Sequence, residues 1–222
     1  MVLRLRRVAA VCRAVGHWVG AVSVPAGRVA TGMVGLAGAV LTLLPAVAAA
    51  AAVPQRVVSL NLCSDQLLVL LAPGRVAALS PLARDPALSF VASRAARLPV
   101  VRPAAETVLR LHPDLVLAGA YGAQTTLALL AQEGVPVWRL DMPQDFAGIR
   151  RQTLALAERL GVPERGAALV AAMDATLAAV RPPAHRITAL AWQPRGYTTG
   201  PGSLMAAVLH AAGLADSADG RR

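Results

Sequence analysis

The feature that most constrains the fold is one long helical pattern at residues 163–181. Pro163 suits a first helical position, and Glu164 places a negative charge at the positive end of the helix dipole. Apolar residues recur at helical spacing along one face, at Val170, Met173, Leu177 and Val180. Pro182 and Pro183 end the pattern, which predicts a rod of roughly 27 Å. Such a rod either bridges two lobes or lies on the surface of a single domain.

Composition limits the kind of protein this is. The 222 residues suffice for one or two domains, and because only 3% are aromatic the core must be aliphatic. The net charge of +10 comes entirely from 22 arginines, since the chain has no lysine. Five of these arginines lie within residues 1–53, and no arginine cluster interleaves with aromatic residues after them. The sequence therefore disfavours nucleic-acid binding.

Residues 1–53 have the layout of a targeting segment. A basic region is followed by an apolar stretch at 29–52 that ends in small residues, as in a secretory signal peptide. An uncleaved N-terminal membrane anchor is the alternative, because about 20 apolar residues can span a bilayer. Both interpretations place residues 54–222 outside the cytoplasm. Removal of this segment with Cys12 would leave Cys63 alone, so we expect neither a disulfide nor a structural metal site.

Strand and helix patterns alternate through residues 54–162. We expect strands at 56–60, 75–79, 99–101, 114–118 and 136–140, and helices at 65–71, 104–111, 124–133 and 145–160. Ser64 is the expected N-cap of the first of these helices. Short connections between alternating elements predict an α/β lobe with a mostly parallel sheet.

Ligands of open parallel sheets bind beyond the carboxyl ends of the strands. The residues expected there are 61–65, 80–84, 119–121 and 141–142, a mixture of polar groups with one arginine, one tyrosine and one methionine. This mixture contains no evident catalytic set. A Cys63–His nucleophilic pair is not expected either, because His112 would lie at the opposite end of a strand from Cys63.

Four segments resemble one known family. RVVSLNLCSDQLL at 56–68 and ETVLRLHPDLVLA at 106–118 resemble the periplasmic substrate-binding proteins of iron-complex and cobalamin ABC importers. The resemblance continues through GVPV at 134–137 and GYTTGPGSLM at 196–205, and it covers residues 54–216. It implies a fold of two α/β lobes joined by one long helix, and so favours the bridging interpretation of residues 163–181.

The resemblance also implies a function and partners. Such a protein binds a ferric siderophore, haem or cobalamin between its lobes and delivers it to an inner-membrane ABC permease. Glu106 matches the first-lobe acidic residue that docks on permease arginines. Ligand contacts would come from loops that match Cys63, Ser64 and Asp65, the segment 80–84, and Tyr121.

Other ligand-binding candidates follow from residue chemistry. Tyr121, Trp192 and Tyr197 are the expected aromatic contacts, Met142 is a further candidate, and Arg84 is expected to bind an anionic group of the ligand. We expect a monomer without catalytic residues, resident cofactor or metal.

Residues 182–222 predict only the beginning of a second lobe. A strand at 186–192 and a helix at 201–212 are expected, whereas the family's second lobe contains several more elements and a second docking acid. We therefore expect an incomplete second α/β lobe and a truncated chain. A truncated or membrane-tethered fragment that binds no ligand is one alternative. A Cys63-dependent enzyme is another, disfavoured because no base converges on the thiol.

Overall fold

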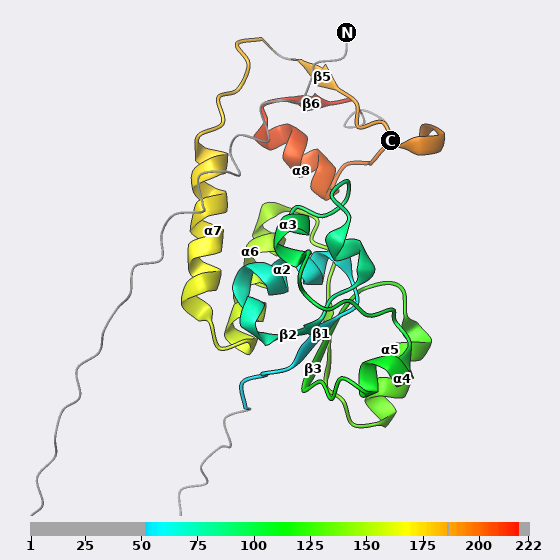
Figure 1. The fold of residues 1–222 in the computed structure, drawn as a ribbon. Helices are drawn as coiled ribbons and strands as arrows, with labels where there is room; N and C mark the ends of the chain where they lie inside the picture. Colours follow the sequence, from blue (N-terminus) through cyan, green and yellow to red (C-terminus); the bar gives the residue numbers. More distant parts are fainter. Residues whose placement is uncertain (1–51, 186, 218–222) are drawn as a thin grey trace, which may run out of the picture. The chain divides into compact units, whose positions relative to one another are not determined.

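The computed structural model describes residues 52–185 and 187–217 (Figure 1). Its main sheet has four parallel strands in the order β2-β1-β3-β4. These strands are β1 (Val57–Ser59), β2 (Val76–Ala78), β3 (Leu115–Gly119) and β4 (Val137–Leu140). The predicted mixed α/β architecture with a parallel sheet is confirmed. The prediction of a strand at 99–101 was wrong, because in this segment a single parallel bridge joins Val100 to Leu79. The predicted signal peptide or anchor lies almost entirely outside the described residues.

Helices follow the strands as the sequence pattern indicated. The main lobe contains α2 (Leu62–Leu71), α3 (Ala92–Ala95), α4 (Ala105–Leu109), α5 (Gln124–Gln132) and α6 (Phe146–Arg159), with 3₁₀ turns at Pro73–Arg75 and Pro81–Arg84. The first of these helices begins earlier than predicted. Its N-cap is Asn61, whose side-chain oxygen accepts a hydrogen bond from the Cys63 backbone N–H at 2.9 Å. The expectation that Ser64 caps this helix was therefore wrong.

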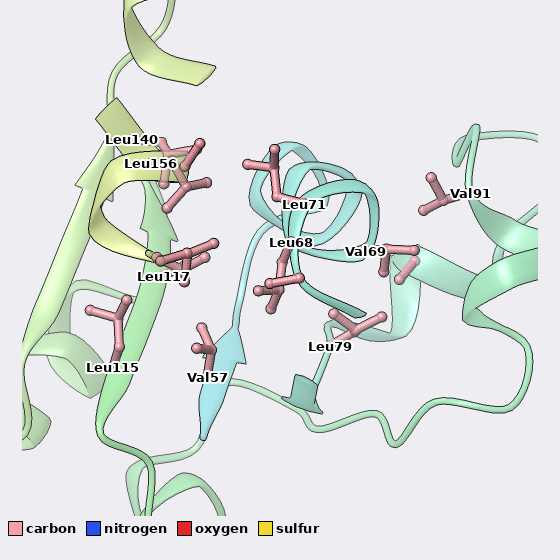
Figure 2. Close-up of a cluster of buried hydrophobic side chains, with 14 of the residues drawn as sticks. Val57, Leu68, Val69, Leu71, Leu79, Val91, Leu115, Leu117, Leu140 and Leu156 are labelled. Atoms are coloured by element: carbon pink, nitrogen blue, oxygen red, sulfur yellow. The ribbon is translucent and has the colours of Figure 1, made fainter. Parts of the chain in front are cut away.

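Both faces of the sheet are buried, each by its own layer of helices. Successive residues of a strand point to opposite faces, so Val57 and Leu117 pack with α2 and α6 whereas Val58 and Val116 pack with α4 and α5. Figure 2 shows the first of these clusters, in which Leu68 and Leu71 of α2 face the sheet. Burial on both faces explains the uninterrupted apolar run of β3.

The long helix α7 (Pro163–Ala178) begins at the predicted residue and ends three residues early. Pro182 disfavours helical conformation in the residue before it, which accounts for the earlier end. The first half of α7 packs on α6, where a Cβ atom added to Gly166 would lie 2.3 Å from the Cβ of Ala157. An ion pair between Arg150 of α6 and Asp174 of α7, at 2.6 Å, joins the same two helices.

A second, smaller βαβ unit follows the double proline. It consists of β5 (Thr188–Ala189), a 3₁₀ turn at Pro194–Gly196, α8 (Leu204–Ala211) and β6 (Ala215–Asp216), and the two strands pair in parallel. The strand expected at 186–192 is thus only two residues long, and the sequence pattern missed β6. The assignment of α7 as a bridge between two lobes, at the boundaries 54–162, 163–181 and 182–222, stays a prediction. Across the described part of the chain, no helix is long and apolar enough to span a bilayer.

Candidate functional site

A cavity of about 600 Å³ opens at the carboxyl edge of the main sheet. Its walls come from α2, the loop that carries Phe90, the connection between β4 and α6, and the segment that leads into α8. Most of its large side chains are apolar: Leu67, Leu70, Phe90, Met142, Ile149, Leu204 and Met205. Its polar side chains include Cys63, Gln66, Asp141, Gln144, Gln152, Thr199 and Ser203. A space of this size and lining suits a mainly apolar small molecule held by a few polar contacts.

The start of α2 positions the cavity wall nearest to β1. A Cβ atom added to Gly119 would come within 2.6 Å of the side-chain nitrogen of Asn61. Glycine is therefore the residue that fits at the end of β3. The Asn61 cap then directs the first turn of α2, where the thiol of Cys63 is free and exposed. One turn later, the side chain of Gln66 accepts a hydrogen bond from the Phe90 backbone N–H at 2.8 Å. This bond holds the Phe90 loop beside α2.

Two predicted ligand-binding residues, Ser64 and Asp65, are fully buried behind this wall. The hydroxyl of Ser64 lies 2.8 Å from that of Ser59, and the Asp65 carboxylate accepts hydrogen bonds from the Ser80 backbone N–H at 3.1 Å and hydroxyl at 2.5 Å. Burial raises the pKa of Asp65, and the hydrogen bonds from Ser59 and Ser80 oppose that rise. This cluster ties the ends of β1 and β2 to α2, which is a structural task.

The remaining predicted ligand residues divide into two groups. Cys63 and Met142 line the same cavity, as their places at the ends of β1 and β4 indicated. Arg84 does not line it, and its guanidinium donates to the carbonyl of Leu98 at 2.5 Å. The three aromatic candidates also lie outside the cavity and are largely exposed: Tyr121 (78%), Trp192 (70%) and Tyr197 (66%). The structure therefore does not bring Arg84 or these aromatic residues together with Cys63.

Sequence reasoning missed Phe90, Leu204 and Met205 as cavity residues. Phe90 lies in a stretch without regular periodicity, so its sequence context gave no signal. Its side chain is 59% exposed, and this exposure can be seen only in the structure. Leu204 and Met205 open α8, and their apolar side chains at a helix start gave no indication of a partner more than 50 residues away along the chain.

A second cavity of about 370 Å³ adjoins the first at the connection between β4 and α6. The two share Asp141, Met142, Pro143, Gln144 and Gln152. The smaller cavity adds Trp138, Arg139, Asp145 and Arg151, so both signs of charge border it. The Arg139 guanidinium donates to the side-chain oxygen of Gln124 at 2.6 Å, and Asp145 accepts from the Gly148 backbone N–H as the N-cap of α6.

Among the described residues, no histidine lines either cavity. His112 precedes β3, and its carbonyl accepts from the Arg56 side chain at 3.2 Å, at the edge of the sheet opposite Cys63. Within residues 52–185 and 187–217, no three histidine, cysteine or acidic side chains are grouped to hold a metal ion.

Comparison with known proteins agrees with this fold. A family model described as "Periplasmic binding protein" matches residues 57–221. The haem-binding protein RhuT from Roseiflexus sp. RS-1 is 26% identical, with a TM-score of 0.57 over 76% of this chain and 68% of that chain. The haem-binding protein HutB of Vibrio cholerae is 19% identical, with a TM-score of 0.64 over 76% and 67% of the respective chains.

A third solved structure, the vitamin B12-binding protein BtuF of Vibrio cholerae, is 21% identical with a TM-score of 0.54 over 77% of this chain and 69% of that chain. No curated protein sequence matches the chain. The family match spans nearly all the described residues, and the fold agrees with the neighbours in its parallel sheet and its helical layers. This chain therefore belongs to the periplasmic binding protein family.

Proposed function

We propose that this protein is the substrate-binding component of an ABC importer for an iron chelate, haem or cobalamin. The observation that carries the proposal is the cavity of about 600 Å³ at the carboxyl edge of a parallel sheet, in a chain that belongs to a family of binding proteins. Its structural neighbours include a haem-binding protein and a vitamin B12-binding protein. The apolar macrocycle of a haem suits the leucine, phenylalanine and methionine lining.

In this proposal the protein binds and releases its ligand, and no bond is made or broken. The ligand rests on α2 and the connection between β4 and α6, and α8 contributes Leu204 and Met205 from the far side. The bridging role of α7 belongs to the same proposal. Attachment of α7 to α6 through Gly166 and the Arg150–Asp174 pair supports it, because a rigid attachment to the first lobe leaves the motion to the segment after α7.

The proposal also covers place and partner. We infer that residues 1–53 direct export to the periplasm, or anchor the chain there, and that the protein acts as a monomer. Glu106 lies exposed in the first turn of α4, a position from which its carboxylate is accessible to arginines of an inner-membrane permease. Tyr121, Trp192 and Tyr197 are available on the surface for ligand or partner contacts, and the same applies to Arg84 if it exchanges its carbonyl partner.

A titration tests the proposal. Haem, a ferric siderophore and cobalamin are added separately to the purified chain. Quenching of the tryptophan fluorescence reports occupancy, because Trp138, one of the three tryptophans, lines the adjoining cavity. Alkylation of Cys63, followed by peptide mass mapping, reports protection of the larger cavity. One ligand class is expected to quench the fluorescence and to protect Cys63 together.

A cavity variant sharpens this test. Phe90→Ala removes a large apolar contact and is expected to weaken binding about tenfold, since a lost apolar contact of that size costs about 1–3 kcal/mol. Leu129→Ala on α5, exposed and outside the cavity, is the matched control and should bind as the parent does. Absence of quenching and protection with all three ligand classes would instead favour a fragment that binds no ligand.

A further inference from the structure

The larger cavity has an unusual charge composition for this chain. The protein has 22 arginines, yet among the described residues that line this cavity none is basic. Asp141 is its one acidic residue, and it lies where the cavity meets its smaller neighbour. Arg84, predicted from the sequence to bind an anionic group, lies outside. The interior therefore offers an anion no cationic partner.

We propose that this cavity selects chelates whose metal-binding core carries no net negative charge, and that Asp141 enforces the selection. This inference rests on the proposed function and names its substrate class. A charge moved from water into an apolar space is strongly disfavoured unless an opposite charge or several hydrogen-bond donors meet it. Asp141 adds repulsion of an anion, whereas it would attract a cation or tolerate a neutral core.

The arginines of the smaller cavity do not remove this selection. Arg139 and Arg151 border that cavity together with Asp141 and Asp145, so the charges there balance. The Arg139 guanidinium is also engaged by Gln124. These arginines can meet an anionic substituent at the edge of a ligand, such as a peripheral carboxylate. The selection consequently concerns the charge of the chelate core, which must enter the apolar space.

Two ferric siderophore complexes of similar size test the inference on the full chain. One is an uncharged ferric trihydroxamate, and the other is a trianionic ferric tricatecholate. Quenching of the tryptophan fluorescence, to which Trp138 contributes, gives the dissociation constants. Protection of Cys63 against alkylation reports occupancy of the larger cavity. Both complexes are measured on the parent protein, on Asp141→Asn and on the matched control Glu133→Gln, whose exposed side chain follows α5 and does not line the cavity.

The uncharged complex is expected to bind about tenfold more tightly than the trianionic one, or more tightly still. Asp141→Asn should reduce the ratio of the two dissociation constants several-fold. Glu133→Gln should leave this ratio of dissociation constants unchanged. Asp141 is exposed, so Asp141→Asn should leave the fold intact. Equal or tighter binding of the tricatecholate overturns the inference, as does an unchanged ratio in Asp141→Asn. Binding of haem or cobalamin but of neither siderophore contradicts the expected binding of the uncharged complex, so it overturns the inference and leaves the proposed function standing. Absence of binding by every ligand overturns both.

Discussion

The main lobe and the segment after α7 use the same βαβ arrangement with very different results. Strands of the main lobe are three to five residues long, and helices cover both faces of their sheet. In the later unit the strands are two residues long, and among residues 182–185 and 187–217 only Ala206 and Asp216 are buried. Large apolar side chains of that unit, including Ile187, Leu190 and Trp192, are half exposed or more.

This difference shows what a parallel sheet requires. Two short strands can satisfy part of each other's backbone, as the parallel pairing of β5 and β6 shows, and the helix that accompanies them is α8. It cannot bury their side chains, because a sheet face is covered only when several elements pack against it. Stability should therefore reside in the main lobe, and the cavity should combine a rigid wall from that lobe with a more pliable wall from α8.

The largest effect is expected from the core of the main lobe. Leu117→Ala removes a fully buried side chain of β3, and large-to-small changes of this kind cost about 2–5 kcal/mol. Leu190→Ala, half exposed beyond β5, should change the free energy of unfolding by about 0.5 kcal/mol or less. Urea unfolding followed by circular dichroism measures both. Similar losses for the two variants would contradict the contrast drawn between the regions.

The attachment of α7 to the main lobe should give the next largest effect. Gly166→Val places side-chain atoms where Ala157 leaves no room, and overpacking of this kind costs about 1–3 kcal/mol. Gly74→Ala is the matched control, since nothing lies within 4 Å of the added Cβ atom. Thermal unfolding compares the two. If Gly166→Val were as stable as the parent, α7 would not be held on α6 as described.

A smaller effect concerns the pH dependence of the main lobe. Because burial raises the pKa of Asp65, the folded state binds a proton at this carboxyl more tightly than the unfolded state does. The stabilisation from this group is complete below its ordinary pKa of 3.8 and is lost as pH rises through the raised value. Asp65→Asn removes this dependence. Relative to that variant, the parent should become less stable as the pH rises from below 3.8 through the raised pKa of Asp65.

Urea unfolding at several pH values measures the Asp65 contribution as the difference between the two proteins. Glu133→Gln, an exposed change outside the buried cluster, serves as the control and should follow the parent at each pH. The difference in free energy of unfolding between the parent and Asp65→Asn could stay constant with pH, or grow in the parent's favour as pH rises. Either result would show that burial does not disfavour the ionised carboxylate of Asp65.

The smallest effect is expected from the ion pair between α6 and α7. The Arg150 guanidinium donates to both carboxylate oxygens of Asp174, and these bonds raise the pKa of Arg150. Both side chains remain in contact with water, so salt should screen the pair. A double-mutant cycle with Arg150→Ala and Asp174→Ala, run at low and high salt, should give a small coupling that shrinks as salt rises. A large, salt-independent coupling would give this pair a greater share in holding α7.

Several features of the fold were predictable from local pattern. The apolar run at 114–118 predicted a buried parallel strand, and β3 forms at Leu115–Gly119 because helices cover both of its faces. Asp145 and Gly161 mark the limits of α6 because a carboxylate can cap a helix start and glycine tolerates the left-handed conformation after its end. The start of α7 at Pro163 follows from the same kind of local chemistry.

The site was less predictable, and the reason differs between residues. Cys63 and Met142 were expected at the carboxyl edge because strand ends meet there in any parallel sheet. Asp65, in the same turn of α2 as Cys63, points into the protein, where Ser80 satisfies its carboxylate. A polar residue near a strand end can serve either the fold or a ligand, and the sequence does not distinguish the two.

The sequence by itself determined the alternation of the four strands of the main sheet with helices, the burial of β3 on both faces and the edge of the sheet at which a cavity opens. These properties depend on backbone preferences and on periodicity within a few residues. Only the tertiary structure decided that Phe90 and Met205 border the same cavity as Cys63 and that no arginine lines it among the residues that the structure describes. Such neighbours are brought together by packing between segments far apart in the chain, and that packing leaves no local pattern in the sequence.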